Sequence, residues 1–173
     1  MTIAACVLSL AAGALAKITD RLSDKGGAHH AGTAVGLAYG MAGGALARFF
    51  PPLAALFWGL AAGNLFSGKF DSKNHQAGLA AFISLQVLLG FPAMDFAAFA
   101  LMAAAAFADE MIAEKTKAAN RAKRRGLLGE TAVLRPLVPI ACLAYGVATG
   151  AYEPLLAIIA FDAAYVAAGM KAI

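Results

Sequence analysis

The chain of 173 residues is 61% hydrophobic and only 14% charged, whereas an ordinary soluble domain has about 25% charged residues. Its apolar residues come in runs of roughly 15 to 20, separated by short polar stretches. A soluble domain of this length cannot bury so much continuous apolar surface in one core. The composition therefore excludes an ordinary soluble fold and predicts an integral membrane protein that forms one transmembrane domain.

Seven apolar segments are expected to form short transmembrane helices, packed as an all-α membrane bundle. The expected spans are 2–16, 31–50, 52–67, 77–90, 95–113, 137–151 and 154–170. Several of them are nearer 15 than 20 residues long, so they would thin the bilayer locally or extend into flanking polar residues.

Proline marks three places where the chain is expected to reverse direction. The three sequences are Phe50-Pro51-Pro52, Phe91-Pro92 and Tyr152-Glu153-Pro154. Proline can open a helix without losing a needed hydrogen bond, so each site predicts a short hairpin. The second segment is then paired with the third, the fourth with the fifth, and the sixth with the seventh.

The basic residues predict the orientation of the bundle in the cell membrane. Thirteen of the fourteen Lys and Arg residues lie in residues 17–30, 68–76 and 114–136 or at Lys171, and only Arg48 lies on the other side. The positive-inside rule places these loops in the cytoplasm, with the N-terminus outside and the C-terminus inside. The run from Arg121 to Arg125 is explained in the same way, by contact with lipid headgroups, and no nucleic-acid partner is expected.

Glycine recurs at four-residue intervals in three of the apolar segments. The glycines are Gly32, Gly36, Gly40 and Gly44, then the pairs Gly59 and Gly63, and Gly146 and Gly150. This spacing lets a neighbouring helix approach closely. It favours packing seams within the chain, but leaves open a homo-oligomer formed through Gly-x-x-x-Gly faces and a gap that admits a membrane lipid chain.

A short internal repeat joins two pairs of helices. Each unit runs from an apolar segment through Lys and Asp to His, Gly and another apolar segment. The first unit contains Lys17, Asp20, His30 and Gly32, and the second contains Lys69, Asp71, His75 and Gly78. Duplicated helical hairpins place equivalent residues around a shared axis. The repeat is thus consistent with a duplication, and the alternative is a chance match between two short segments.

Carboxylates gather at the predicted cytoplasmic helix ends, where the topology rule does not account for them. Asp20 and Asp24 stand four residues apart, as do Asp71 and His75. The three aspartates are predicted to hold Mg²⁺ or Mn²⁺ through oxygen ligands. These residues are equally consistent with ordinary surface ion pairs, such as Asp20 with Lys17.

Other residues near these acids complete a candidate site. The candidate catalytic residues are His75, Asp109 and Glu110, with His75 as general acid–base. Lys17 and Lys69 are predicted to offset the charge of a phosphate, and Gly26-Gly27 would let the backbone approach it.

Asp162 lies near the middle of the last apolar segment. A central aspartate costs roughly 2.5–3.5 kcal/mol on insertion scales, so Asp162 is expected to face a partner or a wet cavity. The alternative is a hydrogen bond to Asn64 or Gln86, which are the polar residues inside the third and fourth segments.

These features favour an integral membrane enzyme that acts on a lipid or polyprenyl phosphate at the cytoplasmic face with a divalent metal. It would be a phosphotransferase or a phosphatase, with the lipid chain in a groove between the small-residue stripes. The alternative is a cation or proton-coupled transporter or channel that uses Asp162 and Asp109. A further alternative is a structural subunit of a membrane complex. The sequence contains no P-loop, HExxH or CxxC motif that would indicate a different chemistry.

Overall fold

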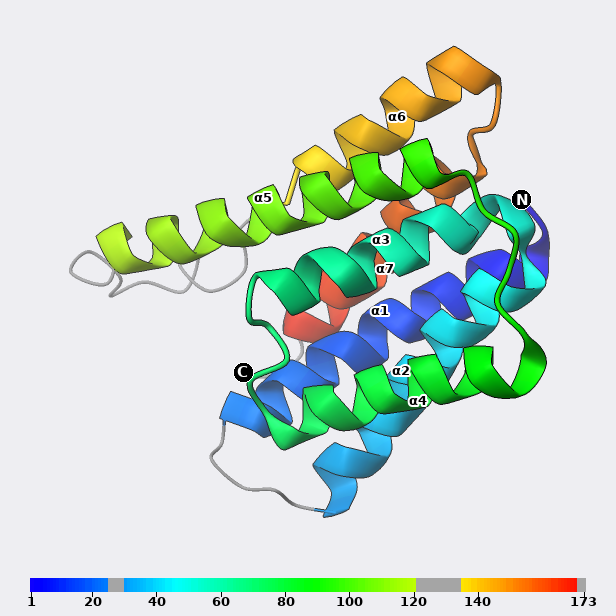
Figure 1. Ribbon diagram of the computed structural model, residues 1–173. Helices are drawn as coiled ribbons and strands as arrows, with labels where there is room; N and C mark the ends of the chain where they lie inside the picture. Colours follow the sequence, from blue (N-terminus) through cyan, green and yellow to red (C-terminus); the bar gives the residue numbers. More distant parts are fainter. Residues whose placement is uncertain (25–29, 121–134, 171–173) are drawn as a thin grey trace.

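The computed structural model of the protein describes residues 1–24, 30–120 and 135–170 (Figure 1). Over these residues the chain forms seven α-helices and one short 3₁₀ turn, with no strand. The helices are α1 (Ile3–Asp24), α2 (His30–Phe49), α3 (Ala54–Phe66), α4 (Lys73–Leu89), α5 (Phe96–Asn120), α6 (Leu137–Thr149) and α7 (Glu153–Met170), and the turn η1 (Pro51–Leu53) joins α2 to α3.

The described helices match the seven predicted apolar segments, which confirms the all-helical fold. The largest difference at a helix end near the site is in α1, which continues to Asp24 instead of ending near residue 16. The hydroxyls of Thr19 and Ser23 each donate to the carbonyl four residues earlier, and the Arg21 guanidinium donates to the carbonyl of Gly169. Contacts with the helix itself and with α7 therefore continue α1 beyond its apolar run.

Among the described residues, three helices are long and apolar enough to cross a membrane: α1, the part Phe96–Lys115 of α5, and α7. The pair formed by α2 and the following η1–α3 also passes this test, but it is bent by 118° at its break, so it adds at most one span. Helix α6 has 13 residues, or about 20 Å, and is shorter than the hydrocarbon core of about 30 Å. Seven spans and the orientation of the loops stay predictions.

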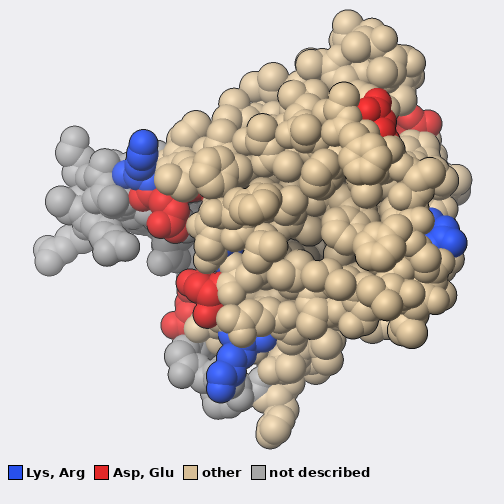
Figure 2. Space-filling model, viewed as in Figure 1, with Lys and Arg blue, Asp and Glu red and all other residues tan. Residues whose placement is uncertain are grey.

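The surface of the bundle is apolar to a degree that soluble proteins rarely show. Large apolar side chains are exposed on several helices, including Ile3 at 85%, Leu88 at 79% and Val147 at 70%. Figure 2 shows one face covered almost wholly by uncharged residues, with acidic and basic side chains at its ends. A band of this kind is suited to lipid, with its charged ends facing water or headgroups.

Glycine determines which helices pack most closely. The most extensive contacts join α2 to α4, α1 to α7, and α3 to α5. A Cβ atom on Gly36 or Gly40 would overlap a backbone oxygen of α4, and one on Gly13 would overlap a backbone oxygen of α7. Gly59 and Gly63 face α5 in the same way. These glycine faces therefore form seams within the chain, while a homo-oligomer stays a prediction.

The expected pairing of neighbouring segments is wrong for the fourth and fifth. Helices α4 and α5 scarcely contact each other, and neither do α3 and α4, although each pair is consecutive in the chain. Instead, α4 packs against α2 and α5 packs against α3. The physical reason is that a glycine seam allows close backbone contact, which outweighs nearness in sequence.

Candidate functional site

A cavity of about 80 Å³ lies inside the bundle and is lined by all seven helices or the residues that flank them. Most of its wall is apolar and includes Phe57, Leu60, Leu79, Phe82, Ile158 and Phe161. Polar side chains line another part of it: Tyr39, Asn64, Asp109, Glu110, Arg135 and Asp162. The cavity is therefore amphipathic, as ligand-binding pockets generally are.

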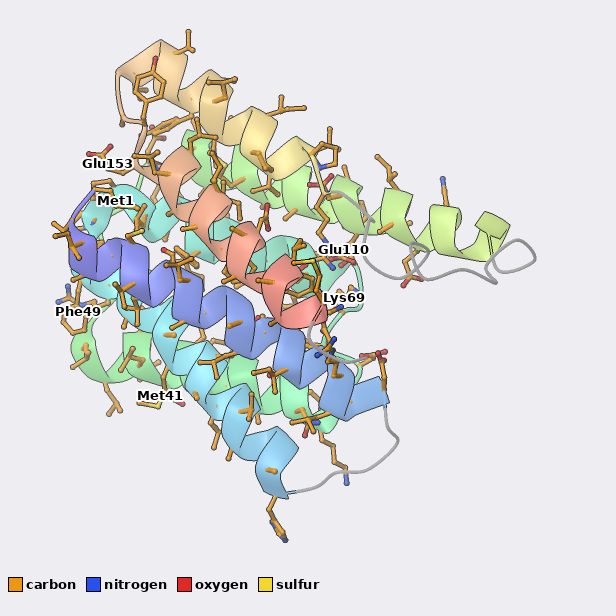
Figure 3. The ribbon with its side chains drawn as sticks, turned by 180° about the vertical axis from the view of Figure 1, so that it is seen from behind. Met1, Met41, Phe49, Lys69, Glu110 and Glu153 are labelled. Carbon is orange, nitrogen blue, oxygen red and sulfur yellow. The ribbon has the colours of Figure 1, made fainter. Side chains whose placement is uncertain are left out.

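Glu110 is the most buried charged residue of the cavity, with 1% of its surface exposed. Its two carboxylate oxygens contact two cations, at 3.3 Å from Lys69 Nζ and 2.6 Å from Arg135 Nη2. Figure 3 shows Lys69 and Glu110 together at the end of the bundle opposite Met1, Phe49 and Glu153. Both cations are needed here because a buried carboxylate without a partner is strongly unfavourable.

Arg135 lies just before α6 and is fixed by charge and by aromatic contact. Burial disfavours the charged guanidinium, but the surrounding acidic groups, of which Glu110 contributes most, together outweigh this effect and raise the pKa of Arg135 above its ordinary value. The guanidinium also lies over the ring of Tyr165, 5.8 Å from the ring centroid. Arg135 thus stays charged at the polar part of the cavity.

Asp109 is buried beside Glu110 but has a different role. Its carboxylate oxygens accept hydrogen bonds from the backbone N–H groups of Leu137 and Val138, at 3.1 and 3.0 Å. These groups belong to the first turn of α6, where backbone donors lack partners within the helix and a negative charge is favourable. Asp109 of α5 therefore caps α6 and holds it in place.

A second polar group joins α1, α4 and α7. The Asp20 carboxylate lies 3.0 Å from His75 Nε2 and accepts a hydrogen bond from the Tyr165 hydroxyl. The His75 ring packs edge-on against Tyr39 and Phe70, both with centroids 6.4 Å away. Since Tyr39 and Phe70 line the cavity, His75 lies directly behind its wall.

Lys17 and Asp162 lie near this group, Lys17 against an aromatic ring and Asp162 in the cavity wall. Lys17 Nζ lies over the Tyr165 ring, 4.8 Å from its centroid, in the seam between α1 and α7. Asp162 lines the cavity together with Asn64. The Gln86 amide, one of the two partners considered for Asp162, instead donates to the carbonyl of Gly44 at 2.9 Å.

The structure does not assemble the three predicted metal ligands as a set. Asp20 contacts His75 and Tyr165, while Asp24 at the end of α1 and Asp71 between α3 and α4 are exposed. Within the described part of the chain, no group of three or more His, Cys, Asp or Glu side chains is arranged to hold a metal ion. These residues as they stand do not fit a bound divalent ion, and Mg²⁺ or Mn²⁺ binding stays a prediction.

The two histidines of the predicted repeat lie in different surroundings, and other predicted residues lie outside the described ranges. His75 is part of the site, whereas its counterpart His30 is exposed at the start of α2. Gly26-Gly27, Lys171 and the run Arg121 to Arg125 lie outside the described residues.

Two important residues were missed from the sequence. From the sequence, Arg135 is only one of the basic residues that predict the topology. Tyr165 received no role, although it lies three residues after Asp162 and so on a neighbouring part of the same helix face. That spacing was the available signal for Tyr165, and the proximity of Arg135 to the first turn of an apolar helix was the signal for Arg135.

Comparison with known proteins gives no relative from which a function could be transferred. No protein-family model, no curated protein and no solved structure matches the chain. The functional argument therefore depends on the site alone.

Proposed function

We propose that this protein is an integral membrane enzyme that acts on a lipid or polyprenyl phosphate. The observation that carries the proposal is the amphipathic cavity, whose apolar wall continues into a group of charged side chains at one end of the bundle. An apolar chain and an anionic headgroup are the two parts of a lipid phosphate. The apolar wall would receive the start of the chain, and the charged part would receive the phosphate.

Lys69 and Arg135 would bind the phosphate by exchanging one anion for another. Both cations now contact the buried carboxylate of Glu110. A phosphate offers several strong acceptor oxygens to the same two cations and suits the planar guanidinium of Arg135. On this proposal Glu110 occupies the phosphate position until the substrate arrives, and then competes with it.

In this proposal His75 keeps the general acid–base role predicted from the sequence, and it would have to reach the phosphate past the rings of Tyr39 and Phe70, which stand between it and the cavity. The Asp20 carboxylate, 3.0 Å from His75 Nε2, fixes the orientation of the imidazole. In a hydrolysis, water adds to phosphorus, the bond from phosphorus to the lipid oxygen breaks, and the proton of the water passes by way of His75 to the leaving lipid oxygen. A phosphotransferase would use an acceptor hydroxyl in place of water.

The proposal is tested by binding of a polyprenyl phosphate to the purified protein in nanodiscs, with the corresponding polyprenol as reference. Lys69→Met and Arg135→Met should each weaken binding of the phosphate by tenfold or more, and leave binding of the alcohol unchanged. Lys73→Met is the matched control, since Lys73 is exposed at the start of α4.

Glu110→Gln supplies a change of opposite sign, which general misfolding cannot produce. Removing the competing carboxylate should tighten phosphate binding, because Lys69 and Arg135 then lack an anionic partner. Equal binding of phosphate and alcohol by the wild type, or unchanged phosphate binding in Lys69→Met, would overturn the proposed function.

A second candidate function is a cation or proton-coupled transporter, and one observation favours it. Asp162 lines the cavity together with two further acids, Asp109 and Glu110. Carboxylates inside a membrane bundle commonly mark an ion or proton pathway. Polar lining residues throughout the thickness of the bundle would be needed for such a pathway, whereas most of this cavity wall is apolar.

A further inference from the structure

Two of the helices that line the cavity, α3 and α4, have few backbone contacts with each other. Leu60, Ala61 and Asn64 of α3 line it, as do Leu79 and Phe82 of α4. Helix α3 packs mainly against α5 and α4 mainly against α2, so the two seams pull these helices toward different partners. Backbone contacts alone do not define an opening, but the lining residues Ala61 and Asn64 of α3 and Leu79 of α4 are partly exposed. We take the cavity to open to the surface between these two helices.

Aromatic residues close both ends of this space. At one end, the Trp58 ring of α3 packs against Phe82 and Phe91, with centroids 5.0 and 5.6 Å away. At the other end, Phe70 in the connection between α3 and α4 lines the cavity, and its carbonyl accepts a hydrogen bond from Gln76 at 3.1 Å. Between Trp58 and Asn64 the opening extends about 9 Å along α3, at 1.5 Å per residue.

The outer side of the opening is apolar. Leu65 of α3 and Ile83 of α4 are exposed beside it, at 49% and 39%. The face that carries α3 and α4 is the nearly uncharged face of Figure 2. On a membrane bundle such a surface contacts lipid chains, so the opening faces the bilayer interior and not water.

The cavity is too small to enclose a lipid. Its volume is about 80 Å³, whereas an engineered apolar cavity that binds benzene has about 150 Å³. Only the first few carbons next to the headgroup fit inside it. The rest of a bound chain must leave the bundle, and the space between α3 and α4 leads directly to the bilayer.

We infer that a lipid phosphate reaches this site sideways from the bilayer, between α3 and α4, and that its chain stays in that opening while the phosphate binds Lys69 and Arg135. This inference rests on the proposed function and adds the class of substrate to it. The substrate is a long-chain lipid phosphate whose chain length beyond the first few carbons does not change its affinity, because the remainder lies in lipid in both the free and the bound state.

Trp58 provides a direct test, because it is the only tryptophan in the chain and stands at one end of the opening. In nanodiscs, a lipid phosphate brominated several carbons from its headgroup should quench Trp58 fluorescence more than the equally brominated lipid alcohol at the same mole fraction. Ala61→Phe fills the opening from the α3 side. In this variant, the lipid phosphate should quench Trp58 fluorescence no more than the lipid alcohol does. Ala80→Phe is the matched control, since Ala80 is exposed on α4 and does not line the cavity.

The outcomes separate the route from the proposed function. Suppose that the wild type binds the lipid phosphate and Lys69→Met does not, but binding causes no phosphate-dependent quenching of Trp58. This result would overturn entry between α3 and α4 and would leave the proposed enzyme function standing. Full quenching retained in Ala61→Phe would do the same. Ala61→Leu, a smaller plug, guards against misfolding and should give an intermediate loss. Absence of any phosphate-selective binding to the wild type would overturn both proposals.

Discussion

The seam between α3 and α5 can be tested with a single added methyl group. A Cβ atom on Gly63 would lie 2.6 Å from the Cβ of Ala106 and 2.7 Å from the carbonyl oxygen of Ala103, whereas ordinary contact begins near 3.4 Å. The two helices would therefore have to separate by roughly 0.8 Å, the difference between the first and last of these values. The proposed opening depends on this seam, because it holds α3 away from α4.

The expected loss follows from comparison with a second glycine. Overpacking of this kind costs about 1–3 kcal/mol, while replacing a helical glycine by alanine gains about 0.8–1.0 kcal/mol. A Cβ on Gly43 in α2 would meet its nearest atom at 3.6 Å, which is ordinary contact. Gly43→Ala should therefore change the free energy of unfolding only through the gain in helix propensity. The difference in this free energy between Gly63→Ala and Gly43→Ala then gives the steric cost at Gly63.

Gly63→Ala should be about 1–3 kcal/mol less stable than Gly43→Ala. The measurement is reversible unfolding in mixed micelles, followed by helical circular dichroism, with the wild type beside both variants. If Gly63→Ala were as stable as Gly43→Ala, α3 and α5 could not pack as closely as described.

Three further predictions concern topology, metal and transport. A single cysteine at Lys73, in a background without native cysteines, should be shielded from an impermeant thiol reagent in intact cells, and labelling from outside would contradict the predicted orientation. If the aspartates bind a divalent ion, Mg²⁺ or Mn²⁺ should raise the melting temperature of the detergent-solubilised protein, and Asp20→Asn and Asp71→Asn should each abolish the rise. Asp162→Asn should leave enzyme activity largely intact; a wild-type proton or cation flux in proteoliposomes that vanishes in this variant would instead establish the transporter.

The helices could be predicted from sequence because their signals are local. Long apolar runs separated by proline and polar residues mark each helix without reference to any other part of the chain. Their partners could not be predicted in the same way. The four-residue spacing of Gly32, Gly36 and Gly40 indicates that some helix comes close, but both an adjacent helix and a distant one satisfy that pattern. The hairpin prediction assumed that helices adjacent in sequence pack together. Helix α4 contradicts it, because α4 packs against α2 and not against α5.

The site shows the same limit. Asp20 and His75 are both predicted as site residues from the sequence, but Asp20 is predicted to share a metal ion with Asp24 and Asp71, and not to contact His75. Their actual contact depends on where α1 and α4 meet, and no spacing within one helix reports that. Tyr165 and Arg135 were missed because each gains its role only when α7 and the start of α6 come close to α1 and α5.

Asp109 and Glu110 show how two adjacent acids acquire different roles. Successive residues on a helix point about 100° apart, so one carboxylate faces the start of α6 and the other faces Lys69 and Arg135. Arg135 precedes the capped backbone of Leu137 by two residues. The cap made by Asp109 therefore fixes the start of α6 and with it the position of Arg135. We expect Asp109 to act as a positioning residue for the proposed phosphate site, whereas the sequence predicted a catalytic role.

Asp109→Asn tests this coupling. The amide keeps one acceptor oxygen and loses the charge, so it weakens the cap by about 0.5–2 kcal/mol. Phosphate affinity should fall although Asp109 does not touch the phosphate, and by less than in Arg135→Met. If Asp109 acts only through Arg135, the double variant should bind phosphate no more weakly than Arg135→Met alone. Additive losses in that cycle would refute the positioning role and return Asp109 to direct contact with the substrate.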